Sequence, residues 1–589
     1  MPMAREFLPT TWNEGAKYYK DFGGFDVVFI SGDPYYDHPL NGVSIIARLL
    51  DAKGYKVAII PQPLTDADYQ ACGRPKYFFC ISSGLLDSML ANYTPMLRKR
   101  ENVLVPERAL MVYTQKIKSF YKGCMTVLGG VEATLRRFTH FDYRTNELRR
   151  GILNDTKADI LIFGNGDRTI LTVLERMKAA TRKEKGTDFE KIRDALDLHS
   201  IDGIAFRTKE NEINTEIRKL PSYEDCMKDA NKFNMLTRMH NLLPDAPFIE
   251  ACGLGYIQHN RSSHTLQEKE LDLVYELPFT RKLHPSTKNK EFQEAMVQKL
   301  STSVVIGRGC WGSCNFCVIP LVQGKEVAKR SKESILKEIE SLYASGAQKI
   351  NDLTLPTLNM YGSYCSLYDT PQKIHSPIIN EEITVYNKPK YCNQQCVGCK
   401  YRKISDDLLP VLEGVEKIQQ KYKGTKLELR SAIRHDIILD QKELFRKMMK
   451  FVTRLKIAPE HLSASVLNQM NKADPQAFKE FLKLYKQVNK EQKSNKHLVP
   501  YFVAAHPGTT MQDMEILKEF CDEQDIFVNL TQVFTPTPGT VATAMYYTGE
   551  NPLTKEKVYV PRTFREKKDQ KNVLLGRERA DEEFEDENG

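Results

Sequence analysis

The stretch TSVVIGRGCWGSCNFCVIP (Thr302–Pro320) places three cysteines directly after a short β-branched run. They are spaced Cys310-x3-Cys314-x2-Cys317 on a glycine-containing turn. Structural zinc takes four protein ligands, whereas thiolates are also the standard ligands of iron–sulfur clusters. A four-iron cluster held by three cysteines leaves one iron open for another ligand. The spacing therefore predicts a metal site with one coordination position left open for a reactant.

A series of strand and helix patterns follows this turn. Buried, β-branched runs alternate with amphipathic helical segments, an order that is typical of a parallel sheet covered by helices. Six such units predict an open, partial barrel, in which chemistry takes place at the carboxyl ends of the strands. The cysteine turn lies at that end of the first strand. The expected strands are Ser303–Ile306, Lys349–Leu353, Leu427–Ile433, Arg454–Ala458, Leu498–Ala505 and Phe527–Phe534.

The part of the chain before the barrel has a similar alternation. Its expected strands are Phe25–Ile30, Lys56–Ile60, Tyr77–Ser82, Met125–Gly130 and Asp159–Phe163, with a short final strand pair in Ile201–Arg207. The helical period of Asn41–Gly54 ends at a glycine stop. This order predicts a doubly wound α/β domain, whose ligands bind at the carboxyl ends of its strands.

We therefore expect an α/β protein with four parts. Residues 1–207 form the doubly wound domain, and residues 208–300 form a bridging region with weaker periodicity. Residues 301–550 form the partial (β/α)6 barrel, which carries a cysteine-bearing insertion at 361–400. Residues 551–589 end in a dense mixture of charges and are expected to be a disordered tail.

Composition sets the class of protein. The 589 residues are 41% hydrophobic and 27% charged, which is normal for a folded globular chain. No secretory signal or membrane-spanning apolar run is present, so we expect a cytoplasmic protein without a membrane partner. In that compartment, 13 cysteines favour metal binding or catalysis over disulfides. The net charge of +9 is spread along the chain and gives no strong nucleic-acid signature.

The pattern C-x3-C-x-aromatic-C after the first barrel strand resembles the signature of the radical SAM superfamily, with Phe316 in the aromatic position. The wider pattern is similar to the YgiQ family of radical SAM proteins, from about residue 25 to residue 552. The segments that carry this resemblance are SGDPYYDHPLNG, VLGGVEATLRRFTHFDY, LPFTRKLHP, RGCWGSCNFC, LPTLNMYG, IRHD, LKIAPEH, PYFVAAHPGT and MYYTGENP.

The resemblance implies a specific chemistry. Cys310, Cys314 and Cys317 would bind a [4Fe-4S] cluster whose open iron chelates S-adenosylmethionine (SAM). One electron from the reduced cluster would cleave SAM to methionine and a 5′-deoxyadenosyl radical, which abstracts hydrogen from a substrate. That electron would come from a low-potential donor such as flavodoxin or ferredoxin. The substrate, small molecule or macromolecule, is not identified by the sequence.

The resemblance also indicates where SAM would bind. The glycine-rich end of strand two, which is typical of the superfamily, should fall near Asn351–Pro356, but this segment reads NDLTLP and has no glycine. The other candidates for the SAM pocket follow strands three, four and five: Ser431, Arg434, Glu460, His461 and His506. No individual catalytic residue is assigned.

A second motif repeats the spacing of the first. It is Cys392-x3-Cys396-x2-Cys399, and Cys365 lies 27 residues earlier as a fourth thiol. Three interpretations are open: an auxiliary [4Fe-4S] cluster, a zinc site with the same four thiols, or loose thiols in an insertion. A segment with little periodicity is typical of a loop that folds around a metal.

A doubly wound domain before a radical SAM barrel looks like a cobalamin-binding domain. Cobalt ligation by histidine usually needs Asp-x-His-x-x-Gly, whereas this chain has Asp37 adjacent to His38 and its glycine, Gly42, one residue late. The motif is not matched, so cobalamin is not expected from it. His38 is then a histidine packed in a turn, a substrate contact or still a cobalt ligand. Cobalamin, if present, could also bind without a histidine ligand, or the domain could have kept only its fold.

Two further functions compete with a radical SAM enzyme of unidentified substrate. A tRNA methylthiotransferase-like enzyme would also use two clusters, but it carries an N-terminal cysteine triad, and Cys72, Cys80 and Cys124 are irregularly spaced. A non-catalytic iron–sulfur scaffold or redox sensor would not cleave SAM. Detection of SAM cleavage separates these alternatives.

Overall fold

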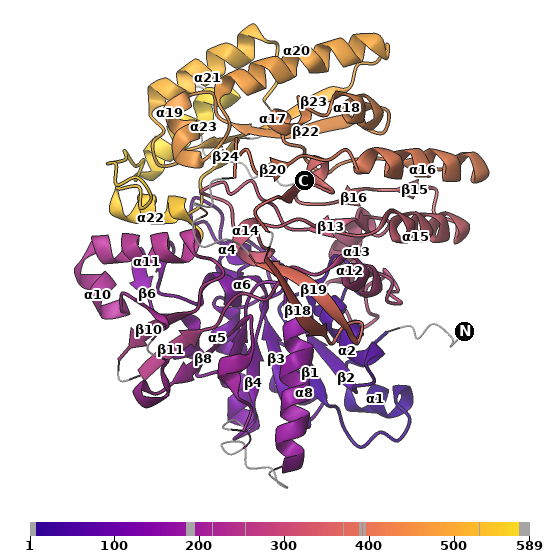
Figure 1. Ribbon diagram of the computed structural model, residues 1–589, viewed down its shortest axis with the longest axis vertical. Coiled ribbons are helices and arrows are strands. Elements are labelled where there is room, and N and C mark those ends of the chain that lie inside the picture. Colours follow the sequence, from indigo (N-terminus) through magenta and orange to yellow (C-terminus); the bar gives the residue numbers. More distant parts are fainter. Residues whose placement is uncertain are drawn as a thin grey trace.

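The computed structural model describes residues 7–183, 192, 195–214, 216–253, 255–368, 370–387, 392, 396–528 and 531–576. The chain is an α/β protein with two halves, the N-terminal half at the bottom of Figure 1 and the barrel half at the top. In the described part of the chain, every helix is too short or too polar to cross a lipid bilayer.

The N-terminal half is built on a nine-stranded sheet in the order β2-β1-β3-β4-β7-β8-β11-β10-β9. The first five strands in that order run parallel, as the alternating sequence pattern predicted. Their bounds are β1 (Val27–Ser31), β2 (Val57–Pro61), β3 (Phe78–Ser82), β4 (Thr126–Leu128) and β7 (Ile160–Ile162). The chain places β2 on one side of β1 and β3 on the other, so the switch point of the sheet lies between β1 and β3.

Alternate residues of these strands enter two separate cores, because successive side chains point to opposite faces of a sheet. Val27 and Phe29 pack with α2 (Gly42–Ala52), α8 (Asp167–Lys183) and α12 (Glu268–Tyr275), whereas Val28 and Ile30 pack with α5 (Ala109–Phe120) and α7 (Ile152–Thr156). This is the doubly wound arrangement that the sequence predicted.

The sheet continues past residue 207, where the sequence analysis had placed its end. Its further strands are β8 (Ile204–Thr208), β9 (Arg218–Leu220), β10 (Phe248–Cys252) and β11 (Gly255–His259). β8 is antiparallel to β7, and β11 and β10 extend this edge as a hairpin. The stretch 208–300 looked like a bridge because its periodicity is weak, whereas β11, β10 and the short edge strand β9 continue the sheet there.

The barrel half has six neighbouring parallel strand positions. In order they are β12 (Val304–Val305), β15 with β16 (Lys349–Ile350 and Leu353–Thr354), β21 (Lys426–Leu427), β22 (Arg454–Glu460), β23 (His497–Ala504) and β24 (Thr531–Val533). A bridge between Ile433 and Ile457 links the third position to the fourth. All six coincide with expected strands, so the partial barrel is present.

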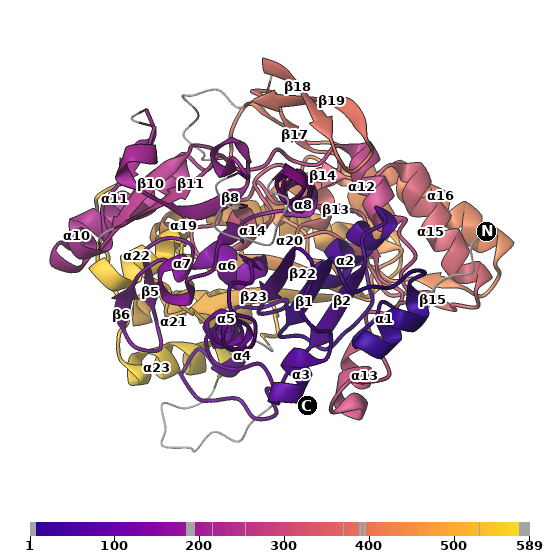
Figure 2. The same ribbon diagram turned by 90° about the horizontal axis from the view of Figure 1, so that it is seen from below.

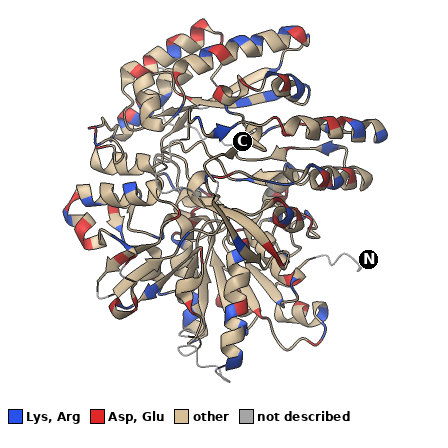
Figure 3. Cartoon of the chain, in the orientation of Figure 1, with Lys and Arg blue, Asp and Glu red and all other residues tan. Residues whose placement is uncertain are grey.

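Helices cover the outside of this barrel and share one continuous core with it. They are α15 (Lys332–Ala344), α16 (Leu408–Lys421), α18 (Lys442–Met449), α20 (Pro475–Glu491) and α21 (Met511–Glu523). Lysine and arginine are interspersed with aspartate and glutamate along their outer faces (Figure 3). The expectation that the protein has no strong nucleic-acid signature stays a prediction from the sequence.

Two segments are more ordered than the sequence indicated. The insertion contains the hairpin of β18 (Thr370–Ser376) and β19 (Glu381–Asn387), which lies across the N-terminal half (Figures 1 and 2), where Ile378 is buried in its core. The stretch 551–589 contains α23 (Phe564–Leu575), which packs on α21. Thr563 and Glu566 form a capping box that starts α23. The end of the stretch, 577–589, lies outside the described residues.

Candidate iron–sulfur site and adjoining cavity

The cysteine turn depends on one glycine. β13 (Gly307–Arg308) is followed by Gly309, whose φ of 90° is a conformation that favours glycine. A Cβ at Gly309 would lie 2.0 Å from the carbonyl oxygen of Glu326, so no other residue fits without moving the backbone. The chain thus turns sharply at Gly309 and directs the following thiols to the carboxyl end of the first barrel strand.

Two of the three thiols lie beside Gly312. A Cβ on Gly312 would lie 3.3 Å from Cys310 Sγ and 3.8 Å from Cys314 Sγ. Burial raises the pKa of Cys317, and negative charge on Cys314 and Cys310 raises it further. Thiols that raise one another's pKa in this way are crowded together and would be stabilised as thiolates by a bound cation. The donor set, three thiols of which two lie beside Gly312, therefore fits an iron–sulfur cluster.

Positive charge lies beside these thiols. Arg434 Nη1 is 3.8 Å from Cys314 Sγ. Asp436 holds the guanidinium from the other side, with Arg434 Nη2 donating to Oδ2 at 2.6 Å. Burial disfavours the Asp436 carboxylate, but the Arg434 charge outweighs this and lowers the pKa of Asp436. The paired carboxylate fixes the arginine next to the cysteine turn.

Glu460 and Lys472 complete the charged surroundings of Cys314. Glu460 ends β22 with a φ of 68°, a strained conformation for a residue with a side chain. Its carboxylate lies 3.6 Å from Lys472 Nζ, which also donates to the carbonyl of Ala458 at 2.6 Å. Burial raises the pKa of Glu460, and the lysine offsets part of that rise. The structure thus brings Arg434 and Glu460 together at the cysteine turn.

Ser431 is engaged within the barrel wall. Its hydroxyl donates to Asp352 Oδ2 at 2.6 Å, and its backbone N–H donates to Oδ1 at 3.1 Å. Asp352 belongs to the NDLTLP segment at strand two, so this carboxylate joins the ends of strands two and three. The hydroxyl of Thr357, just beyond that segment, lies 3.6 Å from Cys310 Sγ.

His461 and His506 are both buried at the ends of β22 and β23. His461 Nδ1 accepts from the backbone N–H groups of Leu462 and Ser463, and His506 Nδ1 lies 2.8 Å from the carbonyl of Pro507. Burial lowers the pKa of His461 to about 4 and that of His506 to about 3. The His506 ring packs against Phe316 of the cysteine turn, which places it behind that turn.

Three residues at this site were not among the sequence candidates: Lys472, Asp436 and Thr357. Asp436 lies in the segment IRHD, which was noted as a resemblance but not assigned a role. Thr357 follows the strand-two segment, where strand order alone could have included it. Lys472 follows a helix, α19 (Ala464–Met470), and no sequence pattern indicates that it folds back to Glu460.

The second cysteine motif contacts the first through Arg402. Arg402 Nη2 donates to Cys396 Sγ at 3.1 Å, and its guanidinium carbon lies 5.3 Å from the ring centre of Trp311, in the cysteine turn. Arg402 also pairs with Glu326 at 3.1 Å. Cys365 in β17 (Tyr364–Cys365) is opposite Arg402 in β20 (Arg402–Lys403). Cys365 and Cys396 are therefore brought to the same arginine.

Cys392 and Cys399 are both partly exposed. The N–H of Cys399 donates to the carbonyl of Cys396 at 3.2 Å, which closes the turn between them. The neighbours 388–391 and 393–395 lie outside the described residues. Within the described ranges, no three His, Cys, Asp or Glu side chains converge closely enough to hold a single metal ion, at either motif. A four-iron cluster separates its thiolates further than a single ion does.

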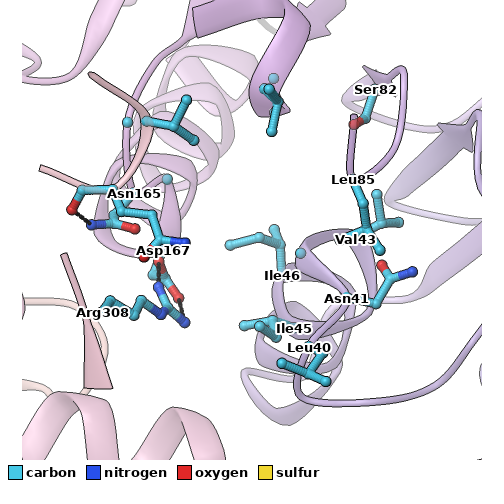
Figure 4. Close-up of a pocket in the computed structure, with 18 of the residues that line it drawn as sticks. Leu40, Asn41, Val43, Ile45, Ile46, Ser82, Leu85, Asn165, Asp167 and Arg308 are labelled. Atoms are coloured by element: carbon cyan, nitrogen blue, oxygen red, sulfur yellow. Dashed lines mark hydrogen bonds and ion pairs between the residues drawn. The ribbon is translucent and has the colours of Figure 1, made fainter. Parts of the chain in front are cut away.

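A cavity of about 440 Å³ lies between the two halves of the molecule. It is bounded by the carboxyl ends of β1, β3, β4 and β7 and by barrel residues that flank the cysteine turn. The barrel contributes Gly307 and Arg308, Val322 and Gln323, and Thr354–Pro356. Figure 4 shows Ile45, Ile46 and Leu40 facing Asp167 and Arg308 across this space.

His38 lies away from that cavity and is a packed histidine. Its Nδ1 accepts from Leu40 N–H at 3.0 Å, and its Nε2 lies 3.2 Å from the carbonyl of Ser301. The ring stacks on Tyr36 with 4.7 Å between centres. Burial, followed by the nearby Arg281 charge, lowers the pKa of His38 to about 3. Both ring nitrogens are thus engaged within the protein.

Comparison with known proteins agrees with this architecture. The family model described as Radical SAM N-terminal matches residues 7–301, and a domain of unknown function, DUF3362, matches residues 529–583. A UPF0313 protein of Methanocaldococcus jannaschii is 37% identical over 600 residues, covering 97% of this chain and 92% of that protein. A UPF0313 protein of Geobacter sulfurreducens is 34% identical over 592 residues, with the same two coverages.

Two solved structures are distant neighbours. The radical SAM methyltransferase TsrM from Kitasatospora setae, with cobalamin and a [4Fe-4S] cluster bound, is 10% identical, has a TM-score of 0.49, and is matched over 87% of this chain and 74% of that chain. The cobalamin-dependent radical enzyme OxsB, with aqua-cobalamin bound, is 10% identical, has a TM-score of 0.47, and is matched over 91% and 57%. On the evidence of its full-length relatives and the matched N-terminal region, the chain belongs to the UPF0313 family of radical SAM proteins.

Proposed function

We propose that this protein is a radical SAM enzyme in which Cys310, Cys314 and Cys317 hold a [4Fe-4S] cluster and SAM binds beside it. The main supporting observation is that Cys310 and Cys314 lie beside Gly312, next to Arg434, at the carboxyl end of the first barrel strand, and that the charges of both act on Cys317. When bound, the cluster and SAM supply a one-electron reductive cleavage that yields a 5′-deoxyadenosyl radical able to take hydrogen from a substrate.

In this proposal, the charged residues around Cys314 position SAM. Arg434 and Lys472 favour the thiolate form of the cysteines and present positive charge to the SAM carboxylate. Glu460 presents a carboxylate to the SAM amino group. Asp436 keeps Arg434 in place from behind. The Ser431 hydroxyl donates to Asp352, so Ser431 forms part of the barrel wall of the SAM pocket. His461 and His506 are buried at the ends of strands four and five and pack behind that wall.

Each cleavage consumes one electron, so we include a low-potential donor such as flavodoxin or ferredoxin among the partners. An auxiliary [4Fe-4S] cluster on Cys365, Cys392, Cys396 and Cys399 is part of the same proposal. Its support is the placement of Cys365 and Cys396 at Arg402, which also touches Trp311 of the first motif. A cytoplasmic location remains an expectation from the sequence.

Cobalamin held by His38 does not fit the contacts of that histidine. His38 was the one histidine placed near the expected motif, and both of its ring nitrogens are bonded within the protein. We therefore derive no step through a histidine-ligated cobalt.

The test is an anaerobic preparation, reconstituted with iron and sulfide and incubated with SAM and dithionite. We expect 5′-deoxyadenosine from the natural sequence and a loss of at least about 100-fold in the variant C310A/C314A/C317A. Cys252→Ala, which removes a partly exposed thiol from β10, is the matched control and should retain the product.

Well-loaded iron without any 5′-deoxyadenosine, under several reductants, would replace this proposal with an iron–sulfur scaffold or redox sensor. Product formation that also requires an RNA substrate would favour the methylthiotransferase-like alternative.

A further inference from the structure

The cavity between the two halves has walls that are mainly apolar. One wall is α2 with the turn before it, including Leu40, Val43 and Ile46. The opposite wall carries Val322 and Leu355 from the barrel half. Ligand sites are typically apolar cavities of this size range with a few placed polar groups. The polar groups of this cavity therefore indicate which kind of ligand it takes.

Its lining contains one ion pair, Arg308 with Asp167, whose two charges cancel. Arg308 Nη1 donates to Asp167 Oδ2 at 2.7 Å, and Arg308 Nε donates to the Tyr275 hydroxyl at 2.7 Å (Figure 4 shows the pair). Asp167 is also the first residue of α8, where a doubly wound sheet would otherwise attract phosphate. Because Arg308 neutralises Asp167, this position has no net charge to select either an anion or a cation.

The remaining charged residue of the described lining is Asp33, which follows β1. Its Oδ2 accepts from the N–H of Leu85 at 2.7 Å. Burial raises the pKa of Asp33 to about 6, partly offset by that hydrogen bond, and no lysine, arginine or histidine is among the groups that shift it. The negative charge of Asp33 in turn helps to raise the pKa of the Tyr113 phenol, on α5. Asp33 is therefore a carboxylate at a mainly apolar cavity, without a cationic partner among the described residues.

We propose that this cavity binds a mainly apolar small molecule that carries an amino group, with the amine on Asp33. The apolar walls take the body of the molecule, and the carboxylate pairs with its ammonium group in a charge-assisted hydrogen bond. Gly307, three residues before Cys310, lines the cavity together with Thr354 of the second barrel strand. The ligand is then the substrate of the radical enzyme, an identification that rests on the function proposed above.

Three probes with one apolar body test the proposal. 1-Adamantanamine, 1-adamantanol and adamantane-1-carboxylate differ only in the polar group, and each is small enough for the cavity. Isothermal titration of the reconstituted protein at pH 7.5 should give the tightest binding for the amine, weaker binding for the alcohol, and binding of the carboxylate at least about tenfold weaker than that of the amine.

Two variants locate the binding. Asp33→Asn should abolish the preference for the amine over the alcohol while both still bind. Ile46→Trp should weaken all three probes by about tenfold or more, because the indole occupies the cavity. Leu64→Trp, at a side chain that is 53% exposed, is the control for adding a tryptophan and should bind as the natural protein does.

Several results would overturn the proposal. Equal binding of amine and carboxylate would remove the role of Asp33, and binding that Ile46→Trp leaves unchanged would place the probes elsewhere. If Ile46→Trp fails to fold, the Asp33→Asn result still decides. If no probe binds but 5′-deoxyadenosine still forms, this inference is rejected and the radical function stands. If the amine binds but no 5′-deoxyadenosine forms, the radical function is rejected, and the cavity is a binding site whose ligand is not a radical substrate.

Discussion

The two cysteine motifs have the same spacing and different surroundings. Cys310, Cys314 and Cys317 follow a barrel strand, on a turn that requires glycine, and their neighbours include the charges of Arg434 and Lys472. The second motif lies in an insertion between strands two and three, and its cysteines differ in exposure: Cys396 is buried, whereas Cys392 and Cys399 are partly exposed.

The difference teaches that cysteine spacing indicates which kind of metal centre a motif could bind, whereas the fold decides which charges and cavities lie beside it. A thiolate set at the carboxyl end of the first barrel strand adjoins both charged residues and a ligand-sized cavity. The second set lies in an insertion and is joined to the first by Arg402 and Trp311. The following predictions test this contrast.

The largest effect is expected from Gly309→Ala. A methyl group there collides with the carbonyl oxygen of Glu326 and forces the first motif out of position. We expect 5′-deoxyadenosine formation to fall by at least about 100-fold, with a matching loss of iron from the first motif. Gly346→Ala is the control, because Gly346 has a φ of 99° and open space around it. It should lose only about 1 kcal/mol of stability and keep its iron. Normal iron and activity in Gly309→Ala would show that the turn does not position the thiols.

The variant C392A/C396A/C399A should separate the two motifs. With an auxiliary cluster in the second motif, the iron content should fall by about half while SAM cleavage persists. Unchanged iron together with a loss of bound zinc would identify a zinc site, and no change in either metal would identify loose thiols. Complete loss of SAM cleavage with folded protein would show that the first motif depends on the second.

The smallest effect is expected from the contact between the motifs. Arg402→Met removes the ion pair at 3.1 Å between Arg402 and the Glu326 carboxylate, which is 16% exposed. Breaking such a pair should cost about 3 kcal/mol, measured as the free energy of unfolding in urea. The double variant Arg402→Met with Glu326→Gln should recover part of that loss, because it removes the carboxylate charge that Arg402 balanced. No recovery would place the effect in the packing on Trp311 and the bond to Cys396 instead.

Much of the fold was readable from the sequence, because strands and helices in parallel α/β structures have strong local patterns. The six barrel strands and the five parallel strands of the N-terminal sheet coincide with β-branched runs. The errors occurred where the local signal was short or misleading. The strands β9, β10 and β11 fall in the stretch expected to be a bridge, and α23 falls in the stretch expected, on account of its charge, to be a disordered tail. The capping pair Thr563 and Glu566 was the available signal for that helix.

The candidate site was predictable in part, for a similar reason. Arg434 and Glu460 follow barrel strands and could be placed at the strand ends by counting strands. Lys472, Asp436 and Arg402 reach the cysteines from outside those positions, and Asp33 meets a cavity wall from the other half of the chain. Contacts between residues so far apart in sequence have no local pattern.

By itself, the sequence determined the two architectures and predicted the class of metal chemistry, because ligand type and hydrophobic periodicity are local properties of the chain. Only the tertiary structure decided which charges surround the thiols, that Arg402 joins the two motifs, and that both ring nitrogens of His38 are engaged within the protein. It also decided that the two halves enclose a mainly apolar cavity at which Asp33 has no cationic partner among the described residues. These features arise from the packing of one half of the chain against the other, and packing depends on every residue at the interface.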